Sequence, residues 1–175
     1  MKITVTRSPA TNGYSDRYDN LIEECSAIIN VSDTPELSFT LASQGKPSFW
    51  FPIHETNDWG YAPFYGSAKV VDHYKTVVIH CHAGVNRSKC VAYAILKAEG
   101  LSDVDISNHI NDDVSRLFGY NMNKWGCIPF DIIPFLYARK ANPTYSIAGL
   151  LQDIKSPNLI VKRPLDTGIK IGILI

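Results

Sequence analysis

Residues 76–99 read TVVIHCHAGVNRSKCVAYAILKAE, and this stretch decides the fold. The run 76–79 is short, continuous and β-branched, which is typical of a strand buried on both faces. Residues 88–99 place apolar side chains at helical spacing, at positions 91, 94, 95 and 98, and Gly100 follows as a helix stop. The stretch therefore predicts a buried strand, a tight loop over 81–87 and an amphipathic helix.

Further elements are predicted on both sides of this stretch. Strands are expected over 3–6, 27–31 and 48–53, where short apolar runs are bounded by turn residues. Helices are expected over 64–74, 103–118 and about 129–140, with Ser102 or Asp103 as the cap of the second. This order predicts an α/β fold, with a central, mostly parallel sheet flanked by helices.

Composition places limits on the class of protein. The chain has 175 residues, enough for one domain with a sizeable core, and 45% of them are hydrophobic. Seventeen Lys and Arg balance seventeen Asp and Glu, so there is no overall basic field for gripping nucleic acid. The apolar runs are too short to span a membrane, and no signal-peptide core is present. Four scattered cysteines do not form a disulfide scaffold, which favours a reducing, cytoplasmic location.

The loop 81–87, which we call the anion loop, has the chemistry of an anion-binding site. It lies where a strand ends and a helix begins, so its backbone N–H groups lack helical partners and the helix dipole adds positive charge. Gly84 permits a positive φ and lets the loop curl its amides inward. Arg87 can hold two oxygens of a tetrahedral anion. The expected ligands of the anion are the backbone amides of His82, Ala83, Gly84, Val85, Asn86 and Arg87, together with the guanidinium of Arg87.

Cys81 is the candidate nucleophile. Beside Arg87 and a helix N-terminus, its thiol is expected to ionise more readily than that of a free cysteine, and a thiolate needs no separate base. Ser88 can donate to the sulfur and stabilise it as a leaving group. His80, at the strand end, is expected to point away from the anion and to fix the loop through a hydrogen bond. The neighbouring Cys90 is expected in the core.

The arrangement His80-Cys81, five residues, Arg87-Ser88 resembles the signature of cysteine-dependent protein tyrosine phosphatases. The Ala83-Gly84 pair is most similar to the compact dual-specificity phosphatases, and the likeness extends over 1–140. It implies a catalytic domain that hydrolyses phosphotyrosine, and in dual-specificity members phosphoserine and phosphothreonine, through a phosphocysteine intermediate. It implies a phosphorylated protein as partner and neither a metal nor another cofactor.

The resemblance also implies a general acid on a loop upstream of the cysteine, here 54–63. Asp58 is the first candidate, and Glu55 is the alternative because it lies close to where several relatives carry the acid after a Pro-Ile pair. Asn121 or Asn123 falls where relatives use an asparagine to brace the anion loop. Aromatic side chains near the acid loop could wall a cleft or pack in the core: Trp59, Tyr61, Phe64 and Tyr65.

Other functions compete with this interpretation. Asn86 is similar to a residue of related RNA 5′-triphosphatases, although the neutral net charge speaks against RNA. A phosphate-binding pseudoenzyme, a rhodanese-type sulfur-transfer domain and an inert core cysteine are further alternatives. Zinc binding by His80, Cys81 and His82 is disfavoured, because consecutive strand residues point to opposite faces. His82 is either an extra donor to the substrate or a surface residue.

The segment 141–175 is expected to pack on the same domain as a C-terminal extension. Its last seven residues alternate, with isoleucine at 169, 171, 173 and 175, which predicts a strand with one apolar face. This strand is expected either at the edge of the domain's own sheet or against another subunit.

Overall fold

The computed structural model describes residues 1–7, 21–34, 45–53, 62–119, 128 and 132–138. Four strands form one sheet: β1 (Lys2–Thr6), β2 (Ala27–Asn30), β3 (Ser48–Trp50) and β4 (Thr76–His80). The helices are α3 (Ala62–Tyr74), α4 (Arg87–Ala98), α5 (Asp103–Ile110), α6 (Ser115–Gly119) and α7 (Ile132–Ala138). The predicted order of strands and helices is therefore confirmed for the described residues, apart from the helix predicted over 103–118.

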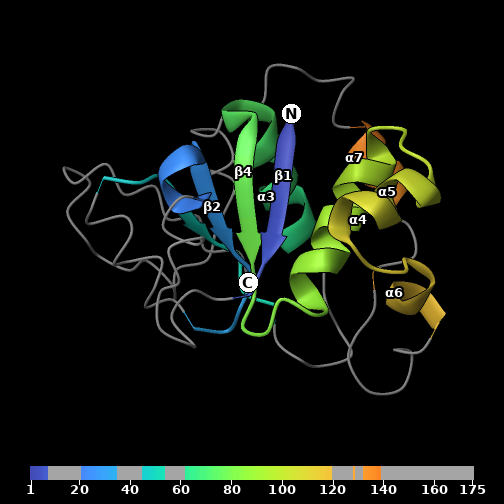
Figure 1. Ribbon diagram of the computed structural model, residues 1–175. Coiled ribbons are helices and arrows are strands. Elements are labelled where there is room, and N and C mark those ends of the chain that lie inside the picture. Colours follow the sequence, from blue (N-terminus) through green and yellow to red (C-terminus); the bar gives the residue numbers. More distant parts are fainter. Residues whose placement is uncertain (8–20, 35–44, 54–61, 120–127, 129–131, 139–175) are drawn as a thin grey trace.

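The sheet is parallel throughout, in the order β1-β4-β2-β3. Ile3 pairs with Val77, and Val77 pairs with Ala27 on its other side. Because the strands are parallel, all four carboxyl ends reach the same edge, where ligands bind in open α/β sheets. In Figure 1, α3 lies behind the strands, and α4, α5, α6 and α7 gather on one side. The predicted α/β class is confirmed, and the sheet is purely parallel.

Two different hydrophobic clusters pack on the two faces of the sheet. One face carries Ile3, Ile29 and Ile79 into a large core cluster that includes Phe64 of α3 and Ile95 of α4. The opposite face has a smaller cluster of Cys25, Ile28 and Val78, with Ile22 packed against it. Alternate residues of β2 and β4 supply the two clusters, as expected for strands covered on both faces.

The ends of two elements differ from the sequence predictions. Strand β3 stops at Trp50, short of the predicted end at residue 53. Its extension still follows β2, since Phe51 N donates to Asn30 O at 2.9 Å and Ile53 N to Val31 O at 3.2 Å.

The single helix predicted over 103–118 is wrong, because the chain breaks into α5 and α6. Asn111 adopts a left-handed conformation with φ +52° and ends α5. Asp113 then accepts a hydrogen bond from Ser115 N at 2.9 Å at the start of α6. Asn and Asp compete with the helix through such local bonds, and the apolar spacing concealed the break. Ser102 is the cap of α5, since its hydroxyl accepts from Asp105 N at 3.1 Å.

Several expectations lie outside the described residues. These are the domain boundary at 140, the C-terminal strand at 169–175 and the acid-loop residues Asp58 and Glu55. Of the four aromatic residues near the acid loop, Phe64 is fully buried in the core, and Tyr65 packs against Phe135 with 5.3 Å between ring centroids. No helix in the part that the structure describes is long and apolar enough to cross a bilayer.

Candidate active site

The anion loop joins the carboxyl end of β4 to the first turn of α4. Its two ends are buried, because Cys81 is 2% exposed and Arg87 is 5% exposed. Its middle reaches the surface: the side chains of His82, Ala83 and Val85 are exposed. The loop therefore holds its sulfur and guanidinium against the core while its crest remains accessible.

Two hydrogen-bonding groups converge on the sulfur of Cys81. Gly84 N donates to Sγ at 3.2 Å, and Oγ of Ser88 lies 3.2 Å from the same atom. The first contact shows that the loop curls back on itself, since residues 81 and 84 are joined across the turn. The second places a hydroxyl from the first turn of α4 beside the sulfur. Both groups can stabilise negative charge on this atom.

Gly84 is required by both conformation and space. Its φ is +68°, in the left-handed region that favours glycine. A Cβ at this position would overlap the backbone nitrogen of Arg7 and come within 2.8 Å of the carbonyl carbon of Thr6. The anion loop therefore lies directly on the chain that leaves β1, with no room for a side chain between them.

The guanidinium of Arg87 is oriented from two other strand ends. Its Nη1 donates to Ile53 O at 2.8 Å and lies 3.3 Å from Oδ1 of Asp33. Asp33 follows β2, and Ile53 follows β3. The two contacts hold the guanidinium at the carboxyl edge of the sheet, and a guanidinium is suited to binding an oxyanion.

The turn that carries Asp33 is built around a buried asparagine. Asn30 is 1% exposed, and its Oδ1 accepts from both the backbone N (2.8 Å) and the hydroxyl (2.6 Å) of Ser32. Its Nδ2 donates to Thr34 O at 2.8 Å. Trp50 Nε1 ties the same turn to β3 by donating to Ser32 O at 2.8 Å. The carboxylate of Asp33 therefore projects from a well-defined turn.

Charged residues from the α5–α6 corner brace the outer side of the anion loop. Arg116 donates from Nη2 to Val85 O at 2.6 Å. Asp112 pairs with Arg116 at 2.5 Å and with Lys89 of α4 at 2.6 Å. The hydrogen bond from Arg116, followed by the contacts with Lys89, lowers the pKa of Asp112 to about 2. Asp112 is thus a carboxylate at neutral pH and joins the loop, α4 and α6.

His80 lies behind the loop and is buried at 1% exposure. Its Nδ1 donates to Cys81 O at 3.3 Å, and its Nε2 has no hydrogen-bond partner among the residues that the structure describes. Burial lowers its pKa to about 4, despite the opposing effect of the bond to Cys81. His80 is therefore neutral near pH 7, with its proton on Nδ1.

The structure brings together most of the predicted site residues. Cys81, Gly84, Arg87 and Ser88 form one cluster. Asn86 lies at the N-terminus of α4 without capping it, and its Oδ1 accepts from Sγ of the core residue Cys90 at 3.5 Å.

The acid candidates and both bracing asparagines, Asn121 and Asn123, lie outside the described ranges.

Sequence reasoning missed two contacts to the loop, those of Asp33 and Arg116. Asp33 could have been found from its place after a strand, because the carboxyl ends of parallel strands meet at one edge. Arg116 carried no such signal, since its place depends on the break between α5 and α6.

No family model matches the chain, and neither does any curated protein. Among solved structures, the fold is similar to that of Tk-PTP. The active form aligns with a TM-score of 0.53 and 17% identity, over 79% of this chain and 93% of that one. A glycine-to-alanine mutant form gives 0.56 and 18%, over 80% and 92%. The core catalytic domain of the PP-IP phosphatase SIW14 from S. cerevisiae gives 0.47 and 14%, over 80% and 86%. The likeness to Tk-PTP establishes a shared α/β fold.

Proposed function

We propose that the protein is a phosphatase that hydrolyses phosphomonoesters through a phosphocysteine at Cys81. The observation that carries the proposal is the convergence of Gly84 N and Ser88 Oγ on the Cys81 sulfur, in a loop that ends at the buried Arg87. This is a preorganised arrangement for a sulfur nucleophile and a tetrahedral anion. The fold shared with Tk-PTP is consistent with it.

The first step transfers the phosphoryl group to sulfur. The phosphate binds the amides of 82–87 and the guanidinium of Arg87. The Cys81 thiolate attacks phosphorus, an S–P bond forms and the ester P–O bond breaks. The departing oxygen takes a proton from a general acid, for which Asp58 is the first candidate and Glu55 the alternative.

The second step releases phosphate. Water attacks the phosphocysteine and gives a proton to the same carboxylate, while the S–P bond breaks and sulfur leaves as a thiolate. Ser88 donates to that sulfur from 3.2 Å, which stabilises the leaving group. Neither step needs a metal ion or another cofactor. The first step needs a reduced cysteine, so we propose a cytoplasmic location.

The proposed substrates are phosphotyrosine and phosphoserine or phosphothreonine in proteins. The test measures hydrolysis of p-nitrophenyl phosphate, a phosphotyrosine peptide, a phosphoserine peptide and a 5′-triphosphorylated RNA, with a chelator present. We expect turnover of the small ester and the phosphopeptides. Preference for the RNA would overturn the protein assignment, and binding without turnover would identify a pseudoenzyme.

The control for this assay is Cys81→Ser. We expect it to abolish turnover while tungstate, a phosphate analogue, still binds, because the amides and Arg87 remain. Appreciable residual hydrolysis by the variant would contradict a phosphocysteine mechanism.

A further inference from the structure

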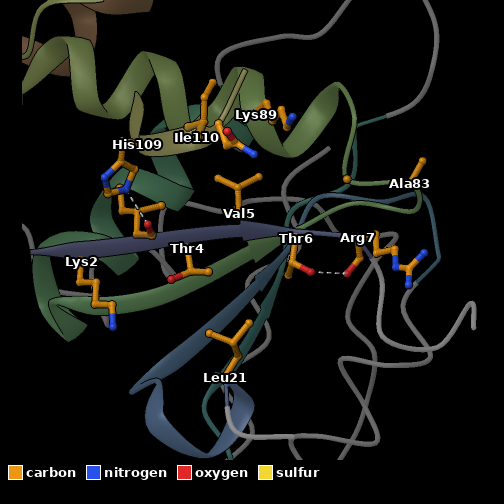
Figure 2. Close-up of a pocket in the computed structure, with 13 residues that line it drawn as sticks. Lys2, Thr4, Val5, Thr6, Arg7, Leu21, Ala83, Lys89, His109 and Ile110 are labelled. Carbon is orange, nitrogen blue, oxygen red and sulfur yellow. Dashed lines mark hydrogen bonds between the residues drawn. The ribbon is translucent and has the colours of Figure 1, made fainter. Parts of the chain in front are cut away.

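A groove of about 730 Å³ runs along β1 and begins at the anion loop. Ala83 and Gly84 form one end of the groove, and the whole of β1 lines its length. We call it the β1 groove, and its remaining lining is Arg7, Leu21, Lys89, His109, Ile110 and Asn111. Figure 2 shows these side chains arranged along the strand from Ala83 to Lys2. The β1 groove therefore adjoins the anion loop, with which it shares Ala83 and Gly84.

The charged groups that line the groove are all basic. They are Lys2, Arg7 and Lys89, and no Asp or Glu is among the described lining residues. Lys2 and Arg7 are exposed at opposite ends of β1. Lys89 pairs with Asp112. At about 3.3 Å a residue, the five residues of β1 span roughly 16 Å. The charge complements an anionic ligand of that length.

The groove also presents the edge of a sheet. Among the strands that the structure describes, β1 is the outermost, with β4 as its neighbour. Lys2 N donates to Lys75 O, so the backbone of Lys2, Thr4 and Thr6 faces β4. Ile3 and Val5 then face the other way, and His109 Nε2 indeed donates to Ile3 O at 2.6 Å from that side. The backbone of Val5 therefore faces the groove.

We propose that the β1 groove binds the acidic peptide segment next to the phosphorylated residue of the substrate. The segment lies beside β1 as an added strand, with hydrogen bonds to the Val5 backbone and carboxylates near Arg7 and Lys2. An extended peptide fits the β1 groove better than a compact polyphosphate does, because the groove is elongated and the backbone of an edge strand lines it. This inference deepens the proposed function and rests on it.

The test compares phosphopeptides that differ only in the charge of the residues flanking the phosphorylated residue. For the wild-type protein we expect kcat/KM on an acidic-flanked peptide to exceed that on a glutamine-flanked one by roughly five- to tenfold at low salt. The ratio should approach one at high salt, because exposed charges are screened. N-methylation of alternate backbone amides of the flank gives two peptides, one for each alternation. Methylation should abolish the effect of the flank on kcat/KM in the peptide whose methylated amides face β1, and should leave that effect unchanged in the other peptide.

Charge reversal separates the groove from general electrostatics. Lys2→Glu and Arg7→Glu should each lower the ratio roughly threefold and should raise kcat/KM on a lysine-flanked peptide. Lys97→Glu is the matched control: its side chain is 35% exposed in the last turn of α4, outside the groove, and the ratio should stay unchanged.

The outcomes distinguish the two proposals. If the wild-type protein hydrolyses p-nitrophenyl phosphate but treats all flanks alike, the groove proposal is wrong and the phosphatase proposal stands. If it hydrolyses neither the ester nor any peptide, both are wrong. Equal effects of Lys97→Glu and Arg7→Glu, or an Arg7→Glu defect confined to the 5′-triphosphorylated RNA, would also overturn the groove proposal.

Discussion

Asp33 Oδ1 lies 3.3 Å from Nη1 of Arg87, although 54 residues separate them in the chain. The contact joins the end of β2 to the first residue of α4. Arg87 is 6% exposed in its side chain and Asp33 is 50% exposed, so the pair reaches from the core to the surface. Together with the carbonyl of Ile53, it orients the group proposed to bind phosphate.

Removing this carboxylate should weaken catalysis moderately. We expect Asp33→Asn to lower kcat/KM on p-nitrophenyl phosphate by roughly two- to fivefold, mainly through a higher KM, because a half-exposed pair contributes little. Steady-state kinetics measures the effect. Glu24→Gln, which neutralises an exposed carboxylate before β2, is the control and should have no effect. An Asp33→Asn enzyme with wild-type KM would show that the carboxylate of Asp33 is not needed to orient the arginine.

The hydroxyl of Ser88 should act on the second step. Ser88→Ala removes the donor 3.2 Å from the Cys81 sulfur, so phosphocysteine hydrolysis should slow by roughly tenfold or more. Rapid-quench kinetics should then show a burst of p-nitrophenol followed by a slow steady rate. Ser67→Ala is a matched control, because Ser67 is equally buried on α3 and its hydroxyl has no partner within the described structure. A Ser88→Ala enzyme that shows no burst would contradict this role.

Gly84 should tolerate no side chain. Gly84→Ala places a Cβ against the backbone of Arg7, so the anion loop must move, and we expect kcat/KM to fall by roughly a hundredfold. Gly100→Ala is the matched control, since Gly100 also has a positive φ of +94° but nothing lies within 4 Å of a Cβ there. It should cost about 1–2 kcal/mol of unfolding free energy and leave kcat unchanged. Similar kinetics for the two variants would disprove the clash.

The general acid is identified by comparing Asp58→Asn with Glu55→Gln. We expect the Asp58 change to lower kcat by roughly a hundredfold or more on a substrate with a poor leaving group, and to matter less on p-nitrophenyl phosphate. The two substrates should differ because a poor leaving group needs a proton to depart, whereas p-nitrophenolate does not. The basic limb of the pH–rate profile on the substrate with the poor leaving group gives a second measurement, because the acid must be protonated in the first step. If only Glu55→Gln collapses kcat, Glu55 is the acid.

Burial of His80 should make stability depend on pH between 6.5 and 4. Its pKa falls from 6.5 to about 4 on folding, so in this window the unfolded chain binds a proton that the folded chain excludes. The free energy of unfolding should therefore be constant above pH 6.5 and decrease by about 3 kcal/mol as the pH falls to 4. Urea unfolding of the wild type and of His80→Asn measures the difference. Parallel profiles for the two proteins would show that His80 is not the source.

Local pattern was enough to predict the elements that build the site. The β-branched run at 76–79 and the helical spacing after Ser88 predict β4 and α4, and these alone place Cys81 and Arg87 at the two ends of one loop. Gly84 was identifiable because a tight turn needs a positive φ. In each case the signal lies within a few residues, where backbone preference and burial agree.

Contacts between distant segments were beyond the sequence pattern. Asp33 reads as an ordinary turn residue until β2 and β4 are paired. The break at Asn111 was hidden because Val114 and Leu117 keep the apolar spacing of a continuous helix, so tertiary packing satisfies the pattern in two helices instead of one. Because the sequence pattern does not reveal this break, it also gives no signal for the hydrogen bond from Arg116 to Val85 O.

The conformation of the proposed catalytic loop depends on the break between α5 and α6. Arg116 can donate its hydrogen bond to Val85 O only while the break at Asn111 and Asp112 separates the two helices. A straight helix would carry Arg116 onward at 1.5 Å a residue, away from the loop. Substitutions that accumulate between α5 and α6 during evolution would therefore weaken the proposed phosphate binding, even if every residue of the anion loop stays unchanged.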